Sequence, residues 1–375
     1  MGQVERLQTN DLELGITDAV KQHITRNVAP SKPVTQARLD FEYNRPRWLR
    51  ECFAEATGVF MFCFPGLASV ASFILNADDE FVITAYGSIF QVGWAFGLGI
   101  AFAIITCGPT SGGHFNPAIT LNLAYWQGFP WPKVPYYILS QIVGAFAAAC
   151  LVTGMYWVQI QEYRAALEAA GDPIVAAGSL ANILVAIPGP TQTNKGYLFM
   201  IEFFVDAFIA FLIWAVLDPA NPFVSPAGAP FLIGMVYAVM IWAFGDITIS
   251  TNLARDLGAR IAAVIFFGRA AFTIDGGYAA IGILVNIPAT FLGVTYYELV
   301  MRDSIKGICG GHLKHKDGDE GLTRHITKHS LYDLERQATK GSGSGRSRRS
   351  EGSSPASPTS PTSTTGFIQS GLANR

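Results

Sequence analysis

Charged side chains are scarce in the middle of this chain of 375 residues. Of its 26 Lys and Arg residues, 8 lie in residues 1–50 and 12 in residues 301–375, which leaves six for the 250 residues between them. Six cationic side chains are too few to give a soluble domain of that size a solvated surface. The scarcity excludes a soluble domain in this region, leaves no basic patch for nucleic acid, and indicates a membrane domain.

Other chemical signatures are missing as well. The sequence contains no Gly-rich phosphate loop, no nucleophile constellation and no metal-ligand spacing, so we expect no catalysis, cofactor or metal. Residues 1–50 are polar and lack the apolar core of a secretory signal. The cysteines mostly lie within apolar runs, and we interpret them as small core residues: Cys52, Cys63, Cys107, Cys150 and Cys309.

Long apolar runs, in contrast, are abundant. A membrane-spanning helix needs about 20 mostly apolar residues. Six stretches qualify, the fifth being the shortest: 52–75, 81–107, 134–158, 197–217, 229–245 and 277–300. An even number of spans places both tails on the same side of the membrane.

The charges that flank the spans indicate which side this is. Positive residues lie at the same set of span ends: Arg45, Arg47, Arg50, Lys133, Arg302 and Lys306. The loop after the first span instead holds Asp78, Asp79 and Glu80. Because positive residues accumulate on the inner side, we expect both tails to be cytoplasmic. The plasma membrane is the expected location, and an internal membrane stays open.

Two further apolar pieces, 114–125 and 250–267, are too short to span. They read "HFNPAITLNLAY" and "STNLARDLGARIAAVIFF", and an Asn lies near the start of each. Irregular backbone at membrane depth is tolerated only where protein or a water-filled cavity satisfies its polar groups. Two half-length helices that enter from opposite faces therefore imply a polar path between them.

The chain also repeats itself. Glu55 opens the first span and Glu202 the fourth, and each is followed by the rest of its span, another span and a half-helix led by Asn116 or Asn252. Three spans per half place the two halves, about 50–160 and 197–303, in opposite orientations. Such an inverted repeat predicts a site at the bilayer midplane.

The Asn residues are suited to begin these half-helices. Asn is a favoured N-cap, and Pro fits the first helical position because it has no N–H to leave unpaired. In Asn116-Pro117-Ala118 the small Ala also permits close packing. Two such starts that meet head-on present two amide donors and two positive helix ends at one narrow point. Water or a polyol could accept hydrogen bonds there, while protons and cations would meet a barrier.

The segments "SGGHFNPAIT" and "STNLARDLGAR" resemble the major intrinsic protein family, the aquaporins and aquaglyceroporins. The resemblance covers about residues 45–303 and implies an all-α membrane protein. Its expected parts are six transmembrane helices, two re-entrant half-helices, a pore in each subunit and a homotetramer. Residues 1–44 and 304–375 lie outside it, and we expect disordered tails there. Long polar tails of this kind resemble those of fungal members.

The second motif is Asn252-Leu253-Ala254, with Leu where the family usually has Pro. Leu is a good helix former, so the helix start should survive. Arg255 follows on the pore-lining half-helix and is expected at the narrowest point, where it would donate to the permeant and repel cations. A snorkelling arginine near a membrane face is the alternative.

Alignment with the family places Phe96, Ile249 and Met240 around Arg255. Three apolar groups beside one guanidinium would suit an alkyl backbone on one side and hydroxyls on the other. Asp256 and Arg260 match the pattern of glycerol facilitators. However, Met240 stands where these facilitators tend to have a small residue. The resemblance therefore favours a passive channel for water and glycerol-type polyols.

Several alternatives stay open. A channel for water and hydrogen peroxide with little glycerol flux is the first, since Phe96 and Met240 could narrow the pore. A secondary transporter can share inverted repeats and broken helices but needs a coupling-ion site. A membrane scaffold or sensor without transport would act through its tails instead.

Other polar residues have supporting interpretations. Glu55 and Glu202 are expected to accept loop N–H groups and brace the half-helices, although intramembrane acids can also relay protons. His114 is expected to be another brace, with a pH sensor as the alternative. The loop at 161–196 could be a vestibule flap or an interfacial segment. In the Ser/Pro-rich tail, kinases are candidate partners at Ser350, Ser354, Ser357 and Ser360, although the tail could simply be solvated.

Overall fold

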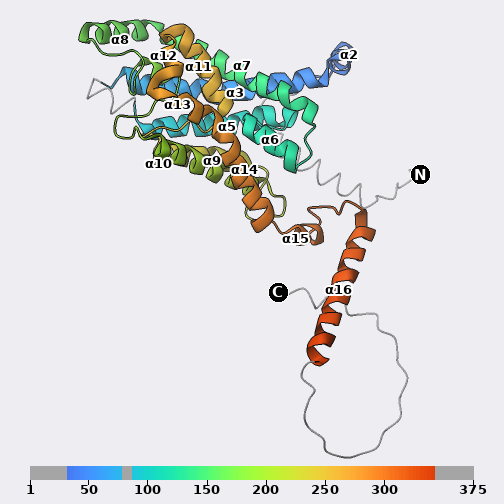
Figure 1. Ribbon diagram of the computed structural model, residues 1–375. Coiled ribbons are helices and arrows are strands. Elements are labelled where there is room, and N and C mark those ends of the chain that lie inside the picture. The colour runs from blue at the N-terminus through green and yellow to red at the C-terminus, as the bar shows by residue number, and fades with distance from the viewer. Residues whose placement is uncertain (1–31, 78–86, 343–375) are drawn as a thin grey trace, which may run out of the picture. The chain divides into compact units, whose positions relative to one another are not determined.

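The computed structural model describes residues 32–77 and 87–342, and within these ranges it contains helices and no strand (Figure 1). The side chains of residues 331–342 are not described. The chain divides into two compact units, Met1–Gly307 and Ile308–Arg375. The first unit contains the expected membrane domain.

Six apolar helical segments form this unit, at the places of the six predicted spans. Five of them are long and apolar enough to cross a membrane, with 23 to 29 residues each, and α10 is shorter with 16. The predicted span 81–107 begins later, because Ser88 caps its helix by accepting from Gln91 N. Residues 78–86, which include the acidic loop residues, lie outside the described ranges. The segments are α3 (Arg47–Leu75), α5 (Ile89–Ser111), α7 (Val134–Met155), α9 (Lys195–Leu217), α10 (Ala229–Phe244), and α13 (Tyr278–Leu284) continued by α14 (Asn286–Tyr296) and the π-turn Tyr297–Met301.

Two short helices lie among the long ones, as predicted. They are α6 (Pro117–Trp126) and α11 (Leu253–Phe267), which approach from opposite ends of the bundle (Figure 1). From the first half of the chain, α6 packs against α14 of the second, and α11 of the second half packs against α7 of the first. The two halves of the inverted repeat are thus interlocked by their half-helices.

Small residues let the long helices approach closely. A Cβ added at Gly144 of α7 would collide with the backbone of Ala56 on α3, and one at Gly293 of α14 with the backbone of Ala207 on α9. Gly234 lies equally close to the backbone of α5. Packing through small residues is the usual source of helix association in lipid, where burial of apolar surface contributes little. The two halves therefore use the same contact at equivalent helix pairs.

The loop expected at 161–196 is partly helical and packed. It contains α8 (Trp157–Ala170) and the short 3-10 turn Leu180–Ile183, which packs against α3 and α11. Residues 180–185 are buried apart from Asn182. This position favours the vestibule alternative over an interfacial segment.

Parts of the two tails that were expected to be disordered are helical in the structure. Residues 36–44 form α2 (Gln36–Asn44), and residues beyond 303 form α15 (Ser304–Cys309) and α16 (Gly318–Ser342). The sequence reasoning weighed the lack of apolar side chains and overlooked local helix support. Thr35 caps α2 by accepting from Arg38 N, and Arg38 pairs with Glu42 one turn later. The candidate phosphorylation sites Ser350, Ser354, Ser357 and Ser360 lie outside the described residues.

Candidate functional site

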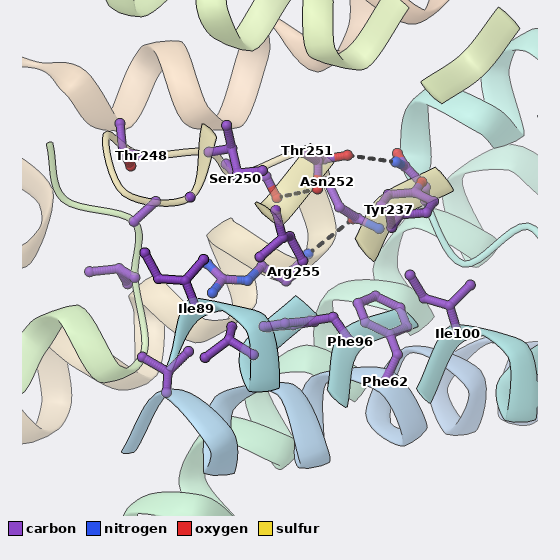
Figure 2. A pocket seen from close by; sticks show the side chains of 18 of the residues that line it. Phe62, Ile89, Phe96, Ile100, Tyr237, Thr248, Ser250, Thr251, Asn252 and Arg255 are labelled. Carbon is purple, nitrogen blue, oxygen red and sulfur yellow. Dashed lines mark hydrogen bonds between the residues drawn. The ribbon is translucent and has the colours of Figure 1, made fainter. Parts of the chain in front are cut away.

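A cavity of about 600 Å³ runs between the two half-helices (Figure 2). Its wall comes from α3, α5, α9, α10, the half-helices with their preceding loops, and residues 177–190. Asn116, Asn252 and Arg255 all line it. The polar residues that the sequence singled out therefore share one cavity, whose wall is otherwise largely apolar.

Both asparagines begin a half-helix, as predicted. Asn116 Oδ1 accepts from Ala118 N at 2.9 Å, and Asn252 Oδ1 accepts from Ala254 N at 3.0 Å and Arg255 N at 3.1 Å. Leu253 occupies the first helical position without disturbing this cap. The reason is that the cap bonds go to the second and third helical N–H groups, so the residue at the first position need not be Pro.

Each asparagine also holds the opposite loop. Asn116 Nδ2 donates to the Thr251 carbonyl at 3.2 Å, and Asn252 Nδ2 donates to the Phe115 carbonyl at 2.9 Å. Phe115 and Thr251 have φ angles of 50° and 59°, a left-handed conformation that is unusual for a β-branched residue such as Thr. This equivalent backbone turn precedes both half-helices, and the Asn amides clamp it across the midplane.

Glu55 supports the first of these turns. Its buried carboxylate accepts from His114 N at 3.1 Å and Phe115 N at 2.8 Å, and Gln141 Nε2 donates to it at 2.7 Å. Three donors satisfy most of the acceptor sites of a carboxylate. These are the contacts that a bracing role requires.

Glu202 occupies the equivalent place in the second half. It accepts from Ser250 N at 3.0 Å and from Thr251 N at 2.6 Å. Both carboxylates thus bind the backbone just before an asparagine, and this symmetry was predicted from the sequence repeat. The bonds favour the brace over the proton relay.

His114 lies in the first turn between aromatic rings. Its ring is 4.6 Å from that of Phe129 and 4.9 Å from that of Tyr137, centroid to centroid, and Nδ1 is 3.2 Å from Thr120 Oγ1. The side chain is buried and also contributes to the cavity wall. Packing of this kind holds the ring in one place, which favours the brace over the pH sensor.

Arg255 and Phe96 face each other across the cavity. The guanidinium carbon is 5.6 Å from the centre of the Phe96 ring, and Ile249 also lines the cavity. Arg255 is only 8% exposed, and its Nη1 has no hydrogen-bond partner among the described residues. Nη1 itself is buried and lies 3.7 Å from Asp256 Oδ1, whereas the rest of the guanidinium lines the cavity and can donate to a molecule there.

The prediction that Met240 lines the constriction is wrong. Tyr237 and Ile241 of α10 line the cavity, whereas Met240 is buried in the apolar core and is not part of the wall. Residues four apart share a helix face, and a neighbouring residue is turned by about 100°. Ile241 therefore supplies the side chain from α10 that alignment assigned to Met240.

Asp256 and Arg260 are fully buried and do not line the cavity. Arg260 binds the Asp256 carboxylate with Nε at 2.8 Å and Nη2 at 3.0 Å. The same guanidinium donates to the carbonyls of Ala271 at 2.6 Å and Ala186 at 3.1 Å. The pair thus ties α11 to the cavity wall at 177–190 and to α12 (Ala270–Thr273). Any influence on solutes would be through the shape of that wall.

Sequence reasoning missed Tyr237, Ile241 and the 177–190 wall. Tyr237 and Ile241 lie one turn apart and share a face of α10, but this spacing does not show which face lines a cavity. The apolar residues of 180–187 were a signal that this loop is buried. No pattern in the sequence distinguished the cavity face of α10 from its core face, because α10 is apolar all round.

Comparison with known proteins gives consistent matches. The model of the family described as "Major intrinsic protein" matches residues 42–274. Aquaporin-3 of Laccaria bicolor is 39% identical over 292 residues, covering 75% of this chain and 86% of that protein. Aquaglyceroporin-2 of Rhizophagus irregularis is 31% identical over 271 residues, covering 71% and 82%. The X-ray structure of the aquaglyceroporin from Plasmodium falciparum shares the fold, with a TM-score of 0.59 at 21% identity over 70% of this chain and 99% of that one.

Proposed function

Because the chain belongs to the major intrinsic protein family, whose members are membrane channels and not enzymes, we propose that glycerol-type polyols pass through its cavity together with water. The observation that carries this proposal is the amphipathic constriction. Arg255 provides a guanidinium on the cavity wall, and Phe96, Ile241 and Ile249 provide apolar walls. Among the relatives, both aquaporins and aquaglyceroporins of fungi are similar to the chain.

A polyol would cross in an extended orientation. Its hydroxyl oxygens would accept from the Arg255 guanidinium and then from the second N–H of each Asn amide, while its carbons contact the apolar wall. The first N–H of each amide is held by the opposite loop. Two hydrogens on each Nδ2 allow both bonds at once. Fixed donors of this kind compensate for part of the water that the solute loses.

We further propose that protons and cations are excluded. The Arg255 guanidinium and the N-terminal ends of α6 and α11 all face the cavity. Each contributes positive potential at the centre of the pore. Both Asn side chains donate toward a permeating water, which would orient it against proton transfer along a water chain.

A second candidate is a channel for water and hydrogen peroxide with little glycerol flux. Tyr237 favours it, since this large phenol lines the cavity beside Asn116, where it would narrow the passage. Hydrogen peroxide is close to water in size and polarity and would still pass.

Stopped-flow light scattering on proteoliposomes separates the two candidates. Glycerol entry several times faster than in empty vesicles is expected for a polyol channel. Fast water shrinkage without glycerol entry would contradict the polyol proposal and favour the second candidate. In that case Tyr237→Ala should admit glycerol, whereas Met240→Leu, outside the cavity, should not.

We also propose how the channel assembles and in which membrane it lies. Exposed apolar side chains on the long helices fit lipid tails or neighbouring subunits, as expected for a homotetramer: Phe102, Ile105, Leu139, Val143, Phe204 and Phe208. Both tails would be cytoplasmic and the membrane the plasma membrane. Unchanged permeability and location after removal of residues 343–375 would exclude kinase regulation through that tail.

A further inference from the structure

Asp206 is an acidic residue of α9 that the transport path does not use. It lies one helical turn after Glu202 and is 1% exposed. Neither of its carboxyl oxygens has a hydrogen-bond partner among the described residues. An ionised carboxylate without partners is very unfavourable in a protein interior at membrane depth. An ionised Asp206 without partners is therefore disfavoured in the folded channel.

The neighbours of Asp206 offer no positive charge. Within the described chain, the groups that interact with its carboxyl electrostatically or by hydrogen bonding are Glu202 of its own helix, Asn286 of α14 and Tyr237 of α10. Glu202 accepts the N–H groups of Ser250 and Thr251 with both of its carboxyl oxygens, an arrangement that suits an ionised carboxylate. A second negative charge one turn away on the same helix face would be repelled. The positive charge of Arg255 interacts electrostatically with Glu202.

Asn286 has an unsatisfied atom of its own. It is 1% exposed, and its Nδ2 donates to the Thr251 carbonyl at 3.1 Å. This bond fixes the orientation of the amide, so the remaining atom, Oδ1, is an acceptor, and it has no partner among the described residues. The Asn286 side chain is within hydrogen-bond reach of the Asp206 carboxyl, so these two buried groups with unpaired oxygens are neighbours on the packed helices α14 and α9. One proton shared between them would satisfy both.

We propose that Asp206 holds a proton in the folded channel, donates it in a hydrogen bond to Asn286 Oδ1, and thereby acts as a positioning residue for the Thr251 carbonyl. That carbonyl accepts from both Asn286 Nδ2 and Asn116 Nδ2. The neutral Asp206 carboxyl therefore orients the Asn286 amide. This amide in turn orients the Thr251 carbonyl, which holds the pore residue Asn116. Figure 2 shows this carbonyl bonded to an amide at the cavity wall beside Tyr237.

The site binds a proton, and its neutrality matters to the channel. Tyr237 lies within hydrogen-bond reach of Asn116 and interacts electrostatically with Asp206. An ionised Asp206 would thus place a negative charge directly behind the pore wall, where it would attract the cations that Arg255 and the helix ends repel. The proton keeps this second layer of polar groups uncharged.

Infrared spectroscopy of the purified full chain in lipid tests the proton directly. The wild type should show the carbonyl stretch of an un-ionised carboxylic acid at neutral and mildly alkaline pH. Asp206→Asn should lower the intensity of this band by the share of one carboxyl, and Asp303→Asn, which removes an exposed carboxyl, should leave the intensity unchanged. A wild type without the band, or a band of unchanged intensity in Asp206→Asn, would overturn the proposal.

Water flux per folded channel tests the positioning role. Asn is neutral and can donate N–H to Asn286 Oδ1, so Asp206→Asn should keep flux within about twofold of the wild type. Leu has a similar volume and no donor, so Asp206→Leu should lose most of the flux. Equal flux in the two variants would contradict positioning, and the infrared result holds even if the Leu variant fails to fold. This part rests on the proposed water path only, and absence of glycerol flux would not affect it.

Discussion

Asn116 and Thr251, which are 135 positions apart, are joined by a hydrogen bond of 3.2 Å across the centre of the bundle. Asn252 makes the equivalent bond to Phe115 at 2.9 Å. In each case an amide that begins one half-helix holds the turn that begins the other. The two halves of the repeat therefore position each other, and neither asparagine could be placed without the opposite half.

The unusual Leu253 allows a first prediction. The N–H of Leu253 takes no part in the Asn252 cap, so Leu253→Pro should fold and conduct water like the wild type. Asn252→Ala removes the cap and should cost about 1 kcal/mol or more of stability. Thermal unfolding in detergent and vesicle shrinkage would measure the two effects. A large stability loss in Leu253→Pro would contradict this description of the helix start.

The face of α10 that lines the cavity gives a second prediction. Ile241→Ala should widen the constriction and raise glycerol flux relative to water flux several-fold, because Ile241 lines the wall. Met240→Leu is the matched control, since it preserves volume in the core and should leave the flux ratio unchanged. The ratio of the two permeabilities is the measurement. A flux ratio that changes in Met240→Leu but not in Ile241→Ala would instead place Met240 at the constriction.

The buried pair of Asp256 and Arg260 gives a third prediction. Arg260→Lys keeps the charge but cannot reach Asp256, Ala186 and Ala271 together, so stability should fall by about 3 kcal/mol or more. Arg269→Lys, at an exposed position, is the control and should change little. Unfolding temperature checks both variants. If Arg260→Lys is as stable as the control, the pair does not hold the 177–190 wall.

Much of this site could be predicted from the sequence because its features are local. An Asn before a short apolar run predicts a helix start wherever it occurs, and the repeated spacing from Glu55 and Glu202 predicted two equivalent turns. The face of α10 could not be read in the same way. A helix that is apolar all round gives no periodic signal, so alignment placed Met240 one residue away from the true wall position.

The structure added relationships that depend on long-range contact. Arg260 joins carbonyls 85 positions apart along the chain, Ala186 and Ala271, and Asp206 meets Asn286 only after α9 and α14 have packed. No local pattern encodes such meetings. The tail helices were not predicted, for the opposite reason. Their supporting contacts are local, but their composition resembles that of a disordered chain.

Cysteine labelling tests most directly that solutes pass the cavity beside Arg255. Ile249 lines this cavity, so water flux through Ile249→Cys proteoliposomes should be blocked by a small mercurial and restored by a thiol. Met240→Cys lies in the core and should resist, as should the wild type, whose Cys63 and Cys107 are buried. Unchanged flux through an Ile249→Cys channel that mass spectrometry shows to be fully labelled would contradict the account.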